Sequence, residues 1–330
     1  GIQRQIDILL IRPRHIAELC ASHGRGVFKI PASHRIAPFA TNKVAVFDAL
    51  NSKKIEVKVT AYENNANGIV KLQLPNDWKI IPNEIPIKID TKGETKTVTF
   101  TVTPPKNEQK TLVKAIVNSD NKIYDKQLVQ ISYPHIPKQI ILESSEAKFV
   151  NLDIKTKGNN IGYIMGAGDE VGKNLENLNY NITYLKTNEI ELEKIKNFDA
   201  IIVGIRAFNV LDDLKFKNKV LFEYVNQGGN LIVQYNTTRG LVTNDFAPYP
   251  LELSHDRVTN ENAKVDFINS SHYALQQPNK ITQKDFEGWI QERGLYFPNK
   301  WDSKFIPILA MNDDGEDVTQ GSLLIAKYGK

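Results

Sequence analysis

Asn160-Ile-Gly-Tyr-Ile-Met-Gly-Ala-Gly-Asp169 opens the stretch that decides the fold of this chain, and the stretch ends at Asn236. Short apolar runs alternate here with segments that carry apolar residues at helical spacing, which predicts βαβ units and a parallel sheet. Residues 201–203 and 231–233 within these runs are continuously apolar, as strands covered on both faces are. We therefore expect this sheet to be the main core. The four runs are 161–165, 180–185, 199–204 and 230–236.

Upstream, between residues 41 and 134, apolar residues recur at every second position. Residues 55–59 and 97–103 alternate apolar with polar side chains, and turns rich in Asn, Asp, Gly and Pro separate seven or eight such runs. This spacing predicts an antiparallel β-sandwich of immunoglobulin-like type. Trp78 follows one of the turns, and we expect it to close an end of the core. The alternative is a platform on which a sugar stacks.

The chain therefore divides into four parts. Residues 1–40 form an N-terminal segment of unknown role, residues 41–134 the sandwich, and residues 135–158 a connector stiffened by prolines. Residues 159–330 form an α/β domain with a doubly wound, flavodoxin-like parallel sheet, truncated at its C-terminal end. The expected fold class is thus multidomain, β plus α/β. Both ends of the sequence look like cuts in a longer protein.

Composition excludes several classes of function. The formal net charge is +4 over 330 residues, which argues against a nucleic-acid partner. The single cysteine, Cys20, excludes an intrachain disulfide and a multi-cysteine metal site. No apolar stretch approaches the roughly 18–20 residues of a membrane span, and the first residues do not form a signal peptide. The histidines before residue 40 stand among arginines, so no metal is expected there.

In a doubly wound sheet, ligands bind beyond the carboxyl ends of the strands. After the first strand, Gly166-Ala-Gly-Asp169 lacks the third glycine of a dinucleotide fingerprint, because Val171 occupies that position. Asp169 and Glu170 would also repel a pyrophosphate at a helix N-terminus. Dinucleotide binding is therefore disfavoured. The other strand ends are 206–209 and 234–236.

Nucleophilic catalysis needs Ser, Cys or Thr on a tight strand-to-helix turn with a base in reach. The turn after the fourth strand offers no such arrangement, so no catalytic residue is assigned. His255 and His272 follow downstream in a long, loop-rich region. The adjacent acid–base pairs at 256–257 and 292–293 in that region either bind a polar ligand or tie the loop to the sheet. The acidic turn 312–317 does not follow the calcium-loop pattern.

Six segments of the chain carry a resemblance to one family. They are Asn160–Glu170, Asp199–Asn209, Gly228–Thr237, Ala247-Pro-Tyr-Pro250, Asp256-Arg-Val-Thr259 and Gly288-Trp-Ile-Gln-Glu-Arg-Gly-Leu-Tyr-Phe-Pro298. Together they are similar to the C-terminal half of large Bacteroidetes proteins of the PIG-L (LmbE-like) deacetylase family. The sandwich resembles the segment that precedes that half, so the resemblance covers residues 41–330.

The resemblance implies that a zinc deacetylase domain for N-acetylglucosamine-type substrates lies upstream, with a His-Pro-Asp-Asp motif. This chain has no such motif, so zinc is expected only in that domain, and no cofactor in this chain. The resemblance also implies a domain like class I glutamine amidotransferases, in which the nucleophile position falls near Tyr235, where active relatives have Cys. We expect the whole protein to be exported, to the periplasm or the cell surface.

We therefore expect a non-catalytic accessory region that presents a surface for a carbohydrate or for the upstream catalytic domain. Arginine and asparagine would bind hydroxyls, and tyrosine and tryptophan would stack on sugar rings. The alternative is a hydrolase that uses the α/β cleft, with His255 or His272 as base. The expected ligand-binding residues are Arg206, Tyr235, Asn236, Asp256, Arg257, Trp289, Glu292 and Arg293.

Overall fold

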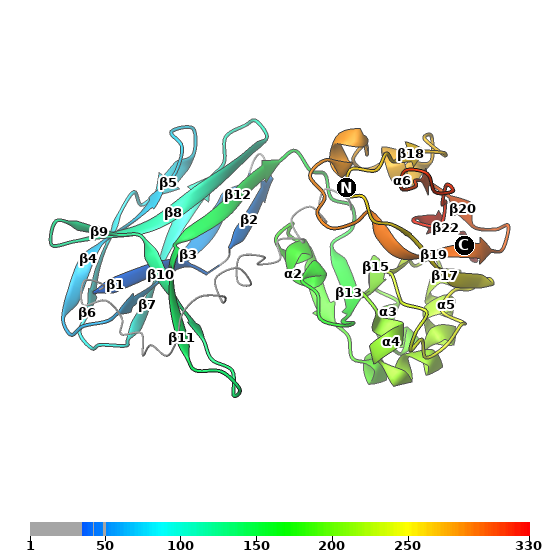
Figure 1. Ribbon diagram of the computed structural model, residues 1–330, viewed down its shortest axis with the longest axis horizontal. Helices are drawn as coiled ribbons and strands as arrows, with labels where there is room; N and C mark the ends of the chain where they lie inside the picture. The colour runs from blue at the N-terminus through cyan, green and yellow to red at the C-terminus, as the bar shows by residue number, and fades with distance from the viewer. Residues whose placement is uncertain (1–34, 42, 49–50) are drawn as a thin grey trace. The chain divides into compact units, whose positions relative to one another are not determined.

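The computed structural model describes residues 35–41, 43–48 and 51–330, and these fall into two compact units (Figure 1). One unit comprises the described residues up to 154, and the other residues 155–330. Most of the predicted N-terminal segment, residues 1–34, lies outside the described residues. The described units are richer in strand than in helix, so the chain is a β-rich, multidomain protein.

The first unit contains two sheets. The four-stranded sheet has the order β1-β3-β7-β5, and all its neighbouring strands are antiparallel. The second sheet has the order β2-β12-β8-β4-β6, with β9 paired to β8. The first sheet contains β1 (Ile36–Ala40), β3 (Lys53–Ala61), β5 (Lys79–Ile81) and β7 (Thr95–Thr103). The second contains β2 (Val44–Asp48), β4 (Ala66–Gln73), β6 (Ile85–Ile89), β8 (Gln109–Ser119), β9 (Lys122–Tyr124) and β12 (Glu146–Leu152).

The unit extends further at both ends than the sequence-based boundaries. β1 lies before residue 41, and β12 falls in the predicted connector, where it pairs with β8 and, in parallel, with β2. A hairpin of β10 (Lys126–Ile131) and β11 (Gln139–Ser144) also occupies part of that connector. The local prolines suggested a linker, but strand pairing between distant segments decides the boundary.

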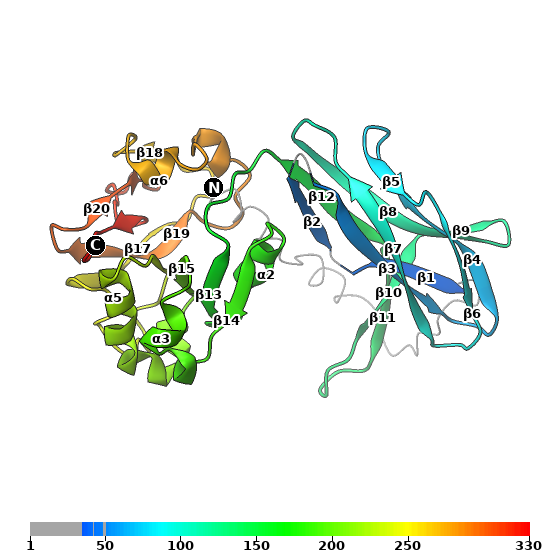
Figure 2. The ribbon, with the colours of Figure 1, turned by 180° about the vertical axis from the view of Figure 1, so that it is seen from behind.

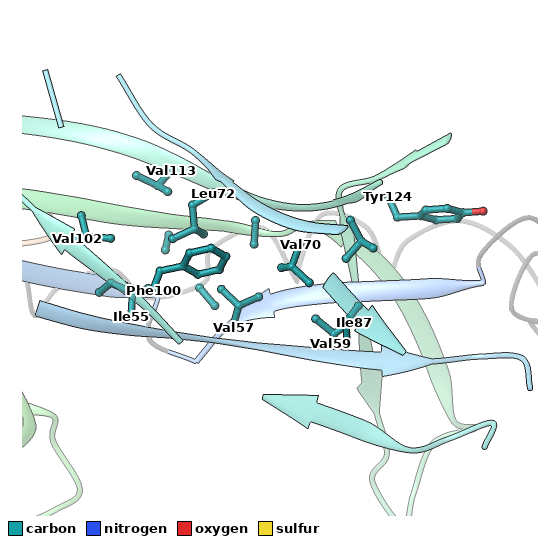
Figure 3. Close-up of a cluster of buried hydrophobic side chains, with 14 of the residues drawn as sticks. Ile55, Val57, Val59, Val70, Leu72, Ile87, Phe100, Val102, Val113 and Tyr124 are labelled. Atoms are coloured by element: carbon teal, nitrogen blue, oxygen red, sulfur yellow. The ribbon is translucent and has the colours of Figure 1, made fainter. Parts of the chain in front are cut away.

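The inner faces of this unit form the larger core of the chain (Figure 3). Val57, Phe100 and Val102 are completely buried at alternating positions, as the period of two predicted. Trp78 is buried beside Phe47, with ring centroids 5.0 Å apart, which confirms its packing role. The expectation that the parallel sheet is the main core was wrong. Two facing sheets bury whole inner faces, whereas the parallel sheet has only four short strands.

Residues 160–233 form the predicted parallel sheet, with strand order β14-β13-β15-β16. Its strands are β13 (Asn160–Ile164), β14 (Asn181–Tyr184), β15 (Ala200–Val203) and β16 (Leu231–Val233). The connections contain α2 (Val171–Glu176), η3 (Thr187–Glu189), α3 (Leu192–Ile195), α4 (Ala207–Val210), η4 (Asp212–Phe216) and α5 (Asn218–Asn226).

Both faces of this sheet are covered. Ile164, Ile201 and Val203 pack in one buried cluster with Leu221 of α5, whereas Ile202 packs in a second cluster with Leu175 of α2. Figure 2 shows α2 and α5 on opposite sides of the sheet. Each buried Ile, Val or Leu contributes about 1.5–3 kcal/mol.

After residue 236 the chain no longer follows the α/β pattern that was expected up to residue 330. It forms short antiparallel pairs, and the longest is a ribbon of β17 (Leu251–Val258) and β19 (Gly294–Trp301). A separate buried cluster that includes Trp289 lies beneath them. Near the C-terminus, β20 pairs with β22 in the antiparallel direction. The remaining elements are β18 (Asp266–Phe267), α6 (Tyr273–Gln276), η5 (Gln283–Phe286), β20 (Ile306–Pro307), β21 (Leu309–Ala310) and β22 (Leu324–Ile325).

Candidate functional site

The carboxyl ends of β13, β15 and β16 meet at one edge of the parallel sheet. The Ala167 amide donates to the Ile205 carbonyl at 2.8 Å, and the Arg206 amide donates to the Tyr235 carbonyl at 2.9 Å. These bonds place Arg206 beside Tyr235, and both side chains are exposed. Two of the expected ligand-binding residues therefore lie together on the surface.

Arg206 occupies the left-handed backbone region, with φ 56° and ψ 25°, at the turn from β15 into α4. The expected nucleophile position at Tyr235 does not have this geometry, because Tyr235 has no positive φ and no helix follows it. The strained strand-to-helix turn of this sheet is therefore at Arg206. No hydrogen bond or ion pair joins its guanidinium to any residue that the structure describes.

Asn236 is buried and holds this edge together. Its Oδ1 accepts from the Phe208 amide at 3.0 Å, and its Nδ2 donates to the Gln234 carbonyl at 3.0 Å. Both ends of the side-chain amide are thus used within the protein. Asn236 positions the start of α4 rather than facing solvent.

A polar network that the sequence did not reveal lies at the same edge. The Tyr163 hydroxyl donates to Asp169 Oδ1 at 2.5 Å and accepts from Gln234 Nε2 at 3.2 Å. The Val171 amide donates to the same carboxylate oxygen at 2.9 Å. Burial, together with the bond to Asp169, raises the pKa of Tyr163 above its ordinary value. In the sequence, the one signal of this network is a tyrosine within a buried strand, because a buried hydroxyl needs a hydrogen-bond partner.

The ribbon of β17 and β19 carries a hollow of ≈ 510 Å³. Asp256 and Arg257, both expected ligand-binding residues, line it. None of its other lining residues was expected to bind a ligand, because they become neighbours only through tertiary contacts. The lining consists of His255, Asp256, Arg257, Pro298, Asn299, Trp301, Glu316, Asp317, Val318, Thr319 and Gln320.

Three register shifts shape this hollow, and the first of them leaves Asn299 without a partner on β17. The second shift leaves Ser254 and His255 unpaired in the register with β19, and the third lies near Tyr296, which has φ 56°. Such β-bulges bend a ribbon and redirect its side chains. They place the rings of His255 and Tyr296 5.7 Å apart. His255 Nε2 also lies 3.4 Å from Thr238 Oγ1, which follows β16, so the hollow adjoins the carboxyl edge of the sheet.

The charges of the hollow are mostly acidic. Arg257 makes a two-pronged contact with Glu316, with N–O distances of 3.3 and 3.4 Å. Asp256 and Asp317 have no cationic partner among the residues that the structure describes. Trp301 is half-buried and contributes the aromatic surface. The hollow can therefore offer acceptors, a fixed guanidinium and a ring to one ligand.

Three other expected binding residues lie elsewhere. Trp289 is only 9% exposed, and its Nε1 donates to the Asp285 carbonyl at 3.1 Å. Arg293 donates to the carbonyls of Ala263 at 2.9 Å and Phe286 at 2.6 Å, and it also stacks on Trp289. Glu292 is half-buried. The structure uses Trp289 and Arg293 to hold the long loop, which was the second interpretation of this segment.

Within the described ranges no three His, Cys, Asp or Glu side chains are placed to hold a metal ion, and no helix is long and apolar enough to span a membrane. In the acidic turn, Asp313 accepts from the amides of Thr259 and Asn260, each at 2.8 Å. This carboxylate therefore joins two loops of the protein.

No protein-family model and no curated protein matches the chain. Among solved structures, it is similar to native E. coli alpha-2-macroglobulin, at 11% identity and a TM-score of 0.23, over 35% of this chain and 6% of that one. It is also similar to WR4, an MSP family member of C. elegans, at 13% identity and a TM-score of 0.20. This match covers 35% of this chain and 97% of WR4. A family 123 glycoside hydrolase from Clostridium perfringens matches at 7% identity and a TM-score of 0.20. This match covers 51% of this chain and 37% of the hydrolase. These likenesses carry no argument about function.

Proposed function

We propose that residues 155–330 form a non-catalytic, carbohydrate-binding region, and that the ligand sits in the ≈ 510 Å³ hollow beside the bulged ribbon. The observation that carries this proposal is the combination of one half-buried tryptophan with a polar lining in a concave site. Carbohydrate ligands combine an apolar ring face with a rim of hydroxyls, and such a site complements both.

Each part of the lining has a distinct role in this proposal. The Trp301 ring packs against the apolar face of a sugar. Asp256 accepts from two hydroxyls, whereas Arg257, held by Glu316, donates in a fixed direction. Arg206 and Tyr235 lie at the neighbouring strand ends and contact an extended ligand rather than its first sugar. Because the lining is mostly acidic, neutral sugars are favoured over acidic ones.

We further propose that residues 159–236 belong to the doubly wound, flavodoxin-like group that includes class I glutamine amidotransferases. The strand order places the third strand beside the first, and apolar clusters cover both faces. An arginine at the strained turn supports a binding role, because a guanidinium is not a nucleophile.

The context of the chain is also a proposal. We propose that the chain belongs to a longer, exported protein of the PIG-L (LmbE-like) deacetylase family, in which zinc is held by an upstream domain. The two units of this chain would then present substrate to that domain. Neither sheet offers a catalytic group of its own in this proposal.

One contact favours the hydrolase alternative. Thr238 Oγ1 lies 3.4 Å from His255 Nε2, within the range of a loose nucleophile–base pair. His272 does not share this site, because its Nδ1 accepts from the Ala274 amide and its ring lines a different hollow. If the chain hydrolyses glycosides or esters, both Thr238→Ala and His255→Ala should abolish turnover. Absence of turnover across both substrate classes would remove this alternative.

Glycan binding is tested by calorimetry against a panel of neutral, amino and acidic oligosaccharides. We expect Trp301→Ala and Asp256→Asn each to weaken binding by about tenfold, equivalent to about 1.4 kcal/mol. Phe216→Ala is the matched control, because this ring is 71% exposed and lies on η4, away from the hollow. An absence of binding across the panel, or an equal loss in the control, would contradict the proposal.

A further inference from the structure

A second hollow, of ≈ 290 Å³, lies beside β20 and β22. It differs from the first in chemistry. Its floor is apolar, because the register pairs Ile306 directly with Ile325. Tyr273 adds an aromatic ring that is 62% exposed. The complete lining is His272, Tyr273, Lys304, Ile306, Ile325 and Lys327, and it contains no carboxylate.

Tyr249 contacts both lysines of this hollow, one through its ammonium group and the other through its backbone. The Lys304 ammonium lies over the Tyr249 ring, 4.2 Å from its centroid. The Tyr249 hydroxyl donates to the Lys327 carbonyl at 3.0 Å, which ties the backbone that follows β22 to the same tyrosine. Neither ammonium forms an ion pair with any residue that the structure describes. The lining of this hollow therefore carries two ammonium groups and no carboxylate that pairs with them.

His272 supplies a third donor. Its Nδ1 accepts from the Ala274 amide at 3.2 Å, which caps α6. A neutral imidazole that accepts at Nδ1 carries its proton on Nε2. The ring also lies 4.5 Å from the Tyr273 ring. The hollow thus combines apolar surface with three groups that donate hydrogen bonds, and no acidic group among its lining residues.

We infer that this hollow binds an organic anion with a flat apolar body, such as an aromatic carboxylate or sulfonate. The apolar body packs on the two isoleucines and on Tyr273. The anionic group lies at the rim, where Lys304, Lys327 and His272 donate to it. The size of the hollow suits a ligand of one or two rings. This site is separate from the proposed glycan site and does not depend on it.

Calorimetric titration with naphthalene-2-sulfonate tests the inference, with 2-naphthalenemethanol as the neutral analogue. The sulfonate should bind in a saturable way at low salt, and the alcohol about five- to tenfold more weakly, because only the sulfonate gains the two exposed charge contacts. Raising the salt concentration should narrow this difference. Saturable binding of the sulfonate that is no tighter than that of the alcohol would overturn the inference, as would no binding at all.

Two double variants locate the site. Lys304→Met with Lys327→Met keeps the aliphatic stems and should remove the five- to tenfold advantage of the sulfonate. Lys219→Met with Lys284→Met removes the same charge from exposed positions outside the hollow and should leave binding unchanged. Ile306→Ser should weaken both probes, since this side chain is already 43% exposed and its loss does not threaten folding. Equal effects of the two double variants would overturn the inference.

Discussion

Replacing Arg206 with glycine should stabilise the protein, although the replacement removes a large side chain. Arg206 sits at φ 56°, in the left-handed region, where a residue with a Cβ pays about 1–2 kcal/mol. Glycine avoids that cost but loses about 0.5–1 kcal/mol through the greater freedom of its unfolded chain. The guanidinium has no partner among the described residues, so its removal costs little. The expected net gain is about 0.5–1 kcal/mol.

Arg206→Ala is the matched control, because alanine also lacks the guanidinium but keeps the Cβ. Glycine should therefore be more stable than alanine by a similar margin, a difference of about 1–4 °C in melting temperature for a unit of this size. Far-ultraviolet circular dichroism is the assay. All α-helices of the described residues, α2 to α6, lie in residues 155–330, so their signal reports on this unit.

The refuting result is a glycine variant that is no more stable than the alanine variant. In that case the left-handed turn is not strained, and strain no longer singles out Arg206 as a functional residue. If the glycine variant is more stable and its binding of an extended glycan is also weaker, the protein keeps an unfavourable arginine for binding.

Three further predictions concern stability. Trp289→Ala should lower the free energy of unfolding by about 3–5 kcal/mol, because it empties a buried site. The exposed control Phe216→Ala should change it by less than about 0.5 kcal/mol, and denaturant titration compares the two variants. A small loss for Trp289→Ala would make that ring a binding candidate again. Asn236→Ala should lower the free energy of unfolding by about 1–3 kcal/mol, because the Phe208 amide loses its partner. Asn236→Asp keeps the acceptor and should lower it by less. Equal losses of stability in the two variants would contradict the role of Asn236 as acceptor for that amide. The amides of Asn159 and Asn160 lower the pKa of Asp199, so its contribution to stability is present above the unfolded-state pKa of about 4 and is lost as the pH falls further. Asp199→Asn should flatten the acid side of a plot of stability against pH, and an unchanged acid side would contradict the pKa shift.

The local sequence pattern predicted much of the architecture. Apolar runs at 201–203 and 231–233 identified the parallel strands, because a strand buried on both faces has no polar positions. Alternation at 55–59 identified the sandwich strands in the same way. The long region after residue 236 could not be predicted in this way. Its longest ribbon pairs residue 251 with residue 301, and such distant pairing leaves no local signal.

Residue type alone could not separate binding residues from packing residues. Trp289 and Trp301 lie twelve positions apart in comparable surroundings, yet Trp289 is buried and Trp301 faces a hollow. Arg293 and Arg257 both follow an acid, yet one holds backbone carbonyls and the other lines the hollow beside Glu316. The tertiary contacts decide each case, because they determine which polar groups find partners inside the protein.

The sequence by itself determined that the chain contains a β-sandwich and a parallel sheet, because both follow from the period at which apolar residues recur. Only the tertiary structure decided where a ligand can bind. The first hollow depends on register shifts between β17 and β19, and the second depends on the pairing of β20 with β22 beside a tyrosine that contacts two distant lysines. Both depend on contacts between residues far apart in the chain, which a periodic pattern does not encode.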